Sequence, residues 1–225
     1  FPPRRRVALY PVWRSGLVFI TFEGGEGSGK STQLRLLVDY LQSVGIDALA
    51  TREPGGAPGA EEIRRLLVEG EPGRWDPLSE TLLHMAARRD HLVRVVRPAL
   101  AAGTWVLSDR FADSTIAYQG HGHGVDRGVI DSLYRIVAGD LKPDLTLILD
   151  IDLDTGLGRA AGRDAGEDRY ENMDRAFHER LRQGFVAIAE AEPGRCKLID
   201  AAGTIEDVQA RIMAAAKAQF SDHLS

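Results

Sequence analysis

The sequence predicts an α/β fold in which five parallel strands form a sheet with helices on both faces. Short apolar runs alternate along the chain with longer segments of helical periodicity, a pattern typical of parallel strands joined by crossover helices. The 225 residues are 44% hydrophobic and 27% charged, so one domain can bury a large core. In such folds ligands bind at the carboxyl ends of the strands, where we expect the functional motifs to meet.

The predicted strands are the apolar runs at 17–22, 46–51, 104–108, 144–149 and 195–200. The predicted helices fill the periodic segments at 30–43, 59–69, 77–101, 112–119, 126–138, 153–161, 171–191 and 204–219. Gly45, Gly103 and Gly139 fall near helix ends, where a left-handed residue is favoured. Residues 17–219 are predicted to form this single domain, and residues 1–16 are expected to be a flexible N-terminal extension.

Charge and cysteine content narrow the choice of partners. The net charge of −5 gives no global attraction to nucleic acid or to an anionic membrane, so any phosphate affinity has to come from local arginines and lysines. Cys196 is the only cysteine, which excludes an intramolecular disulfide and fits a reducing compartment. No apolar stretch approaches the roughly 20 residues that span a bilayer. We therefore expect a cytoplasmic protein with neither a nucleic-acid nor a membrane partner.

The strongest motif is Gly24-x-x-x-x-Gly29-Lys30-Ser31, which follows the first predicted strand and opens the first predicted helix. This is the P-loop pattern, in which backbone N–H groups surround nucleotide phosphates, the lysine reaches the β and γ phosphates, and the serine hydroxyl ligates Mg²⁺. A glycine-rich turn without a ligand is the alternative, but the flanking strand and helix both favour the P-loop. The predicted ATP-binding residues are Gly24, Gly25, Glu26, Gly27, Ser28, Gly29, Lys30, Ser31 and Thr32.

Two further motifs follow predicted strands. In Thr51-Arg52-Glu53-Pro54-Gly55-Gly56 a stiff proline precedes glycines that allow close approach to a ligand, although a plain loop explains the segment equally well. In Ser108-Asp109-Arg110 the carboxylate is placed to hold Mg²⁺ or its water, and the guanidinium to bind a phosphate. An ion pair that caps the next helix is the alternative there.

A basic segment with two glycines, running from Arg159 through Arg163 to Arg169, joins two predicted helices. Arginines on a short tether fit a lid near 159–170 that neutralises charge and excludes water once the substrates are bound. A solvated charged loop is the alternative.

These residues together resemble the thymidylate kinase family over positions 17 to 218. The resemblance is carried by Phe22-Glu23-Gly24 through Thr32, Arg52 through Gly56, Leu82-Leu83 through Arg88 and His91, Pro98-Ala99-Leu100, and Asp109-Arg110-Phe111 through Gln119. It implies a P-loop kinase fold and the ATP-dependent phosphorylation of dTMP to dTDP in pyrimidine deoxynucleotide biosynthesis. It also implies Mg²⁺ and a homodimer, with the 77–101 helix as a possible interface. Glu26 in the P-loop and arginines in the lid resemble the bacterial type, whose catalytic arginine comes from the lid.

The resemblance also implies individual roles. Glu26 would accept the sugar 3′-hydroxyl, Arg88 would donate to thymine O4, and Tyr118 would exclude a 2′-hydroxyl. The implied dTMP-binding residues are Glu26, Arg52, Glu53, Pro54, His84, Arg88, Arg110, Ser114, Thr115, Tyr118 and Gln119. The expected catalytic residues are Lys30, Arg110, Arg159, Arg163 and Arg169, and the expected Mg²⁺ ligands are Ser31 and Asp109.

The sequence departs from the family pattern at two positions. His84 stands where a phenylalanine usually stacks on thymine, and Ala161 stands where a middle lid arginine is often found. His84 can stack as a neutral ring or be an ordinary helix-surface histidine, and if it stacks we expect acid to charge it and weaken dTMP binding. Other P-loop small-molecule kinases, a nucleotide-dependent switch or assembly ATPase, and a non-catalytic nucleotide-binding module remain as alternatives that assays with and without dTMP would separate.

Overall fold

A computed structural model describes residues 17–160 and 169–224 of the chain. Its core is a five-stranded sheet in which all neighbouring strands are parallel, in the order β2-β3-β1-β4-β5. The strands are β1 (Phe19–Glu23), β2 (Ala48–Arg52), β3 (Trp105–Asp109), β4 (Leu145–Asp150) and β5 (Cys196–Asp200). The predicted α/β class and all five predicted strands are confirmed, with ends that move by no more than two residues.

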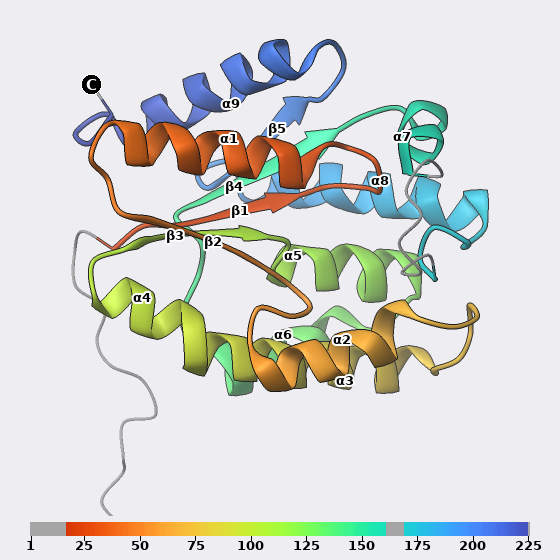
Figure 1. The fold of residues 1–225 in the computed structure, drawn as a ribbon. Helices are drawn as coiled ribbons and strands as arrows, with labels where there is room; N and C mark the ends of the chain where they lie inside the picture. The colour runs from red at the N-terminus through yellow and green to blue at the C-terminus, as the bar shows by residue number, and fades with distance from the viewer. Residues whose placement is uncertain (1–16, 161–168, 225) are drawn as a thin grey trace, which may run out of the picture.

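Helices cover both faces of the sheet (Figure 1). They are α1 (Lys30–Ser43), α2 (Pro58–Val68), α3 (Pro77–His91), α4 (Arg97–Ala101), α5 (Ala112–Thr115), α6 (Arg127–Ala138), α7 (Leu153–Ala160), α8 (Arg175–Ala191) and α9 (Ile205–Gln219). Two wide π-helical segments, η1 (Leu92–Val96) and η2 (Ile116–Gly122), continue α3 and α5. Among the helices of the described residues, none has the length and apolarity that a membrane crossing requires.

The core consists of one apolar layer on each face of the sheet. Because side chains alternate along a strand, Ile20 and Phe22 of β1 point toward α1 and α9, whereas Phe19 points toward the opposite layer with α3, α6 and α8 (Figure 1). β1 lies at the centre, between β3 and β4, and Phe19 and Phe22 are almost completely buried. The loop that follows β1 is therefore held by a rigid, fully covered strand.

Local sequence explains where several helices begin. The Asp76 carboxylate accepts hydrogen bonds from the N–H groups of Leu78 and Ser79, and Asp174 accepts from Phe177 in the same way. For this reason α8 starts at Arg175, four residues later than the predicted start at 171. The predicted helix at 77–101 is continuous but widens at η1, because Pro98 has no N–H to complete the regular ladder.

Candidate active site

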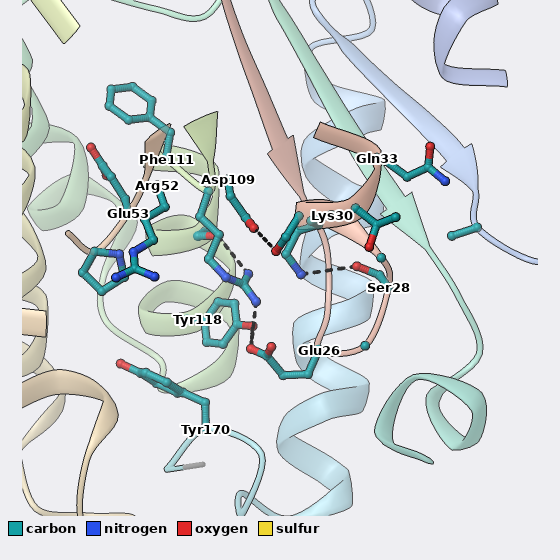
Figure 2. A pocket seen from close by; sticks show the side chains of 18 of the residues that line it. Glu26, Ser28, Lys30, Gln33, Arg52, Glu53, Asp109, Phe111, Tyr118 and Tyr170 are labelled. Atoms are coloured by element: carbon teal, nitrogen blue, oxygen red, sulfur yellow. Dashed lines mark hydrogen bonds and ion pairs between the residues drawn. The ribbon is translucent and has the colours of Figure 1, made fainter. Parts of the chain in front are cut away.

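The loop between β1 and α1 folds around the ammonium group of Lys30. The Lys30 Nζ donates to the carbonyls of Gly25 at 2.7 Å and Gly24 at 3.2 Å, and it lies 3.3 Å from the Ser28 hydroxyl (Figure 2). Gly24 has a φ of 129°, and a Cβ there would collide with the carbonyl of Leu149 on β4, so only glycine fits. Burial and the nearby Arg110 charge lower the pKa of Lys30 to about 8, which leaves the group largely protonated at neutral pH.

Two oxygen-bearing side chains, the expected Mg²⁺ ligands, meet where α1 begins beside the end of β3. The Ser31 hydroxyl donates to Asp109 Oδ2 at 2.5 Å (Figure 2). The described part of the chain contains no cluster of three or more His, Cys, Asp or Glu residues suited to a metal. A hydroxyl and a carboxylate alone fit Mg²⁺, which keeps several waters and commonly takes its other ligands from substrate phosphates.

Arg110 is the residue that joins the P-loop to the opposite wall of the site. Its φ is 71°, in the left-handed region that residues with a Cβ rarely adopt. From this position Nη1 donates to the Gly24 carbonyl at 3.0 Å and to the Ser114 hydroxyl at 3.2 Å, and Nη2 donates to Glu26 Oε1 at 2.8 Å. The guanidinium therefore lies between the phosphate loop and the helical segment from α5 into η2.

Glu26 and Tyr118 lie next to one another in the cavity, with the Tyr118 hydroxyl directed at the Glu26 carboxylate (Figure 2). The Tyr118 hydroxyl donates to Glu26 Oε1 at 2.6 Å, and the Arg110 guanidinium lies 5.0 Å from the centre of the Tyr118 ring. Burial alone would raise the pKa of Glu26, but the charges of Arg110 and Lys30 and the Tyr118 hydroxyl together lower it to about 2. Glu26 is therefore a carboxylate at neutral pH.

Arg88 is buried at the far end of the same space. Its Nε donates to Glu53 Oε2 at 2.7 Å, and its Nη2 donates to the Phe111 carbonyl at 2.9 Å and to Thr115 Oγ1 at 3.0 Å. With 2% of its surface exposed, the side chain cannot reorient without breaking this network. Its guanidinium is thus a fixed, planar donor suited to reading one edge of a ligand.

His84 is half-buried near Arg88, and its Nε2 lies 2.9 Å from the Tyr170 hydroxyl. Burial lowers the pKa of His84 to about 4; Glu80 opposes this shift and Arg88 adds to it. The ring is therefore neutral between pH 5.5 and 7.5. This environment contradicts the expectation that acid in this range weakens ligand binding by charging His84.

Glu23 lies directly behind Arg110. It accepts hydrogen bonds from the Phe111 N–H at 2.8 Å and from the Ser114 hydroxyl at 2.5 Å. Burial and the neighbouring Asp113 carboxylate raise the pKa of Glu23 to about 7, although Ser114 and Arg110 partly oppose this shift. Because Ser114 contacts both Glu23 and Arg110, this buried acid supports the wall that holds the guanidinium.

A cavity of about 840 Å³ brings most of the expected site together. The expected residues that line it are Glu26 through Thr32, Arg52, Glu53, Pro54, His84, Arg88, Asp109, Arg110, Ser114, Thr115, Tyr118, Gln119 and Arg159. Gly24 and Gly25, at the start of the P-loop, do not line this cavity and border a smaller one instead. At the rim, Arg52 is half exposed and pairs with Glu61 at 3.1 Å.

The three expected lid arginines have different positions. Arg159 is exposed at the end of α7 and lines the cavity, whereas Arg163 lies outside the described residues. Arg169 is fully buried, where it pairs with Glu80 and donates to the Leu67 carbonyl at 2.8 Å. In this arrangement Arg169 fastens the chain to α2 and α3 and does not face the P-loop.

Sequence reasoning missed the part of the cavity beyond the P-loop. Ala201, Gly203, Thr204, Ile205 and Val208 line it from the turn after β5 and from the start of α9. The signal was available, because the carboxyl end of every parallel strand faces this edge, and β5 had been predicted. Tyr170 was also missed as a lining residue, and no motif separates it from an ordinary core aromatic. Phe111 was missed as a lining residue although it belongs to the Asp109-Arg110-Phe111 motif.

Comparison with known proteins agrees with this geometry. The family model described as thymidylate kinase matches residues 22–212. A thymidylate kinase of Caulobacter vibrioides is 55% identical over 194 residues, which cover 86% of this chain and 93% of that protein. One of Nitrobacter winogradskyi is 53% identical over 88% of this chain and 86% of its own length. A crystal structure of thymidylate kinase from Ehrlichia chaffeensis superposes with a TM-score of 0.72 at 38% identity, covering 88% of this chain and 98% of that one.

Proposed function

The chain belongs to the thymidylate kinase family and phosphorylates dTMP to dTDP, and from that premise we propose how its residues divide the reaction. The observation that carries the proposal is the position of Arg110, whose guanidinium contacts both the P-loop carbonyl of Gly24 and the opposite wall at Ser114. A cation between the two halves of one cavity suits a reaction that has to bring two polyanions together.

The donor half is built on the P-loop. ATP would bind with its phosphates on the backbone N–H groups of residues 24–32 and on Lys30, and with its base toward Thr204 and Ile205. Ser31 and Asp109 would hold Mg²⁺, which when bound neutralises charge on the donor phosphates. Lys30 contributes a fixed positive charge because its ammonium remains largely protonated at neutral pH.

The acceptor half is built on residues from β2, α3 and the segment after β3. Arg110 and Arg52 would bind the dTMP phosphate, and Arg88 would donate to thymine O4. Glu26 uses Oε1 for Arg110 and Tyr118, so we assign Oε2 to the sugar 3′-hydroxyl. The Tyr118 ring would occupy the space that a ribose 2′-hydroxyl needs. Thr115 and Gln119 line the base end, and His84 would stack as a neutral ring.

The chemistry itself needs no general base. The acceptor phosphate is largely ionised at neutral pH because its second pKa is about 6. Catalysis therefore consists of alignment and charge neutralisation by Lys30, Arg110 and a lid arginine. We assign the lid role to Arg159 or Arg163, because Arg169 is committed to Glu80 in the described structure.

The direct test is a coupled assay with ATP, Mg²⁺ and a set of acceptors. We expect dTDP from dTMP, with dUMP a poorer acceptor, because one methyl group changes transition-state binding by roughly 1–3 kcal/mol. Turnover of CMP or AMP as good as that of dTMP would overturn the acceptor assignment. ATP hydrolysis that does not respond to dTMP would point to a switch or assembly ATPase.

We also propose that the protein is a homodimer that acts in the cytoplasm. Apolar side chains are exposed along the continuous helix of α3 and η1, among them Leu82 at 48% and Val93 at 46%. A second copy of this chain would cover such a face. Light scattering should give twice the mass of one chain for the parent and a lower mass for Leu82→Glu. The single, buried Cys196 supports the cytoplasmic proposal, because it fits a reducing compartment.

A further inference from the structure

His91 is a completely buried histidine for which the proposed reaction has no direct use. It ends α3, one turn beyond Arg88, and 0% of its surface is exposed. Its Nδ1 lies 2.9 Å from Glu53 Oε1, and its Nε2 lies 2.7 Å from the Thr51 hydroxyl. Both ring nitrogens therefore have a polar partner on or just after β2, and one of these partners is the carboxylate that also holds Arg88.

The hydrogen-bond network fixes the direction of the contact between His91 and Glu53. Burial would raise the pKa of Glu53, but Arg88 and His91 together lower it, so the carboxylate is ionised and can only accept. His91 Nδ1 therefore carries a proton and donates to Glu53 Oε1. The Thr51 hydroxyl can donate to an unprotonated Nε2 or accept from a protonated one, so it holds the ring in either state.

The result is a relay of oriented groups that ends at the base site. Thr51 orients His91, His91 holds one oxygen of Glu53, and the other oxygen holds Arg88 Nε at 2.7 Å. Arg88 Nη2 is used by the Phe111 carbonyl and Thr115. Arg88 Nη1 makes a long contact of 3.7 Å with the sulfur of Met85, a weak acceptor, so this nitrogen can donate to a ligand.

The backbone packs directly against the contact between Thr51 and His91, and His91 and Glu53 are buried. A Cβ at Gly56 would lie 2.6 Å from Thr51 Oγ1 and 2.7 Å from His91 Nε2, and the φ of Gly56 is 80°. Glycine lets the loop close directly over the threonine–histidine contact. In this water-poor setting a lost hydrogen bond leaves a buried polar atom unpaired, so the orientation of each group depends on the next one.

We propose that His91 and Thr51 are positioning residues for base selection, acting through Glu53 to hold the Arg88 guanidinium toward the acceptor atom at position 4 of the pyrimidine. This inference rests on the proposed role of Arg88. Base selection would then depend on two residues that do not touch the ligand. A loosened guanidinium can still find a polar partner on cytosine, whereas a fixed donor meets the N4 amino group of cytosine as a second donor and rejects it.

The test compares dTMP with dCMP through the ratio of their kcat/KM values. His91→Leu removes the Nδ1–H donor, and we expect the ratio to fall about tenfold, the effect of one lost buried hydrogen bond. The loss should appear in KM for dTMP, with kcat within about threefold, because the phosphate-binding groups are untouched. His91→Asn puts an amide N–H near the Nδ1 position and should restore most of the ratio, although asparagine fills less space than leucine.

Equal ratios for His91→Leu and the parent would overturn the proposal, and so would equal losses for His91→Leu and His91→Asn, since packing alone would then explain them. If the His91 variants do not fold, the near-isosteric Thr51→Val replaces them. We expect its ratio to fall about threefold, and an unchanged ratio would overturn the proposal. Thr104→Val is the matched control. The Thr104 hydroxyl donates to Asp47 at 2.6 Å, and Thr104 does not line the cavity.

Arg88→Gln separates this inference from the proposed function on which it rests. We expect Arg88→Gln to reduce the ratio at least as much as His91→Leu, because the donor itself is lost. If Arg88→Gln leaves the ratio unchanged, the assignment of Arg88 to the base is wrong. If Arg88→Gln changes the ratio and the His91 and Thr51 variants do not, the relay alone is wrong.

Discussion

Tyr118 contributes two physically separate features, and two substitutions can divide them. Its hydroxyl donates to Glu26 at 2.6 Å, and its ring lies against Arg110, 5.0 Å from the guanidinium. Tyr118→Phe removes only the hydroxyl. Arg110 still holds Glu26 at 2.8 Å, so we expect Glu26 to remain ionised but less firmly oriented.

The size of the effect follows from the type of hydrogen bond. A hydrogen bond to a charged group contributes about 1.5–3 kcal/mol. Because Arg110 still holds Glu26 in this variant, we take the lower end of that range. It corresponds to a loss of roughly tenfold in kcat/KM for dTMP. The preference for dTMP over ribothymidine monophosphate should stay within about threefold of the parent, because the ring still fills the space beside C2′.

Tyr118→Ala removes the ring as well and should relax the sugar preference. The ring also packs against Tyr170 and Phe185, with centroids at 5.3 and 6.3 Å, so truncation opens a hole and costs about 3–5 kcal/mol of unfolding free energy. The assay should therefore run well below the melting temperature of the variant. If Tyr118→Phe relaxes the sugar preference as much as Tyr118→Ala, or if Tyr118→Ala leaves it unchanged, the steric explanation is refuted.

Four other outcomes can be measured on the same protein. Lys30→Ala should cut kcat sharply. Arg159→Ala and Arg163→Ala should identify the lid arginine, because replacing that residue should lower kcat more than twofold and leave the affinity for dTMP unchanged. His84→Phe should bind dTMP at least as well as the parent. Its binding should show the same pH dependence between 5.5 and 7.5, because the pKa of His84 is about 4. If acid weakens dTMP binding less in His84→Phe than in the parent, the ring titrates in this range. The raised pKa of Glu23 means that the folded protein binds more protons than the unfolded chain between pH 4.5 and about 7, so its contribution to stability is lost as pH rises through that window. Thermal melts of Glu23→Gln should lose less stability between pH 5 and 8 than those of the parent, and parallel curves would contradict the assignment.

Local patterns were sufficient to predict most of the fold. Each strand was a short apolar run, and each crossover helix had a periodic face, so the strands and helices followed from the sequence. The wide turns of η1 were not predictable from periodicity, because they depend on how the chain accommodates Pro98 within a long helix. The start of α8 was misjudged because Asp174 was not recognised as its cap.

The site was predictable where one short motif supplies both the functional side chains and the backbone conformation that places them. The P-loop and the Asp109-Arg110 pair belong to this class, because adjacent parallel strands bring them to one edge. Pairings between distant residues were not predictable. Arg169 was expected in the lid, but the structure pairs it with Glu80, 89 positions earlier in the chain. The neutral state of His84 likewise depends on burial and on charges supplied by other residues.

The left-handed backbone of Arg110 implies a conflict between thermal robustness and catalysis. Such a conformation costs a residue with a Cβ about 1–3 kcal/mol, and glycine would adopt it with little strain. A library screened for melting temperature alone would therefore be drawn toward glycine or asparagine at position 110 and would lose the guanidinium that we propose acts between donor and acceptor. Any thermostabilised version of this enzyme should be selected with turnover as a second criterion, and position 110 should be kept constant in its design.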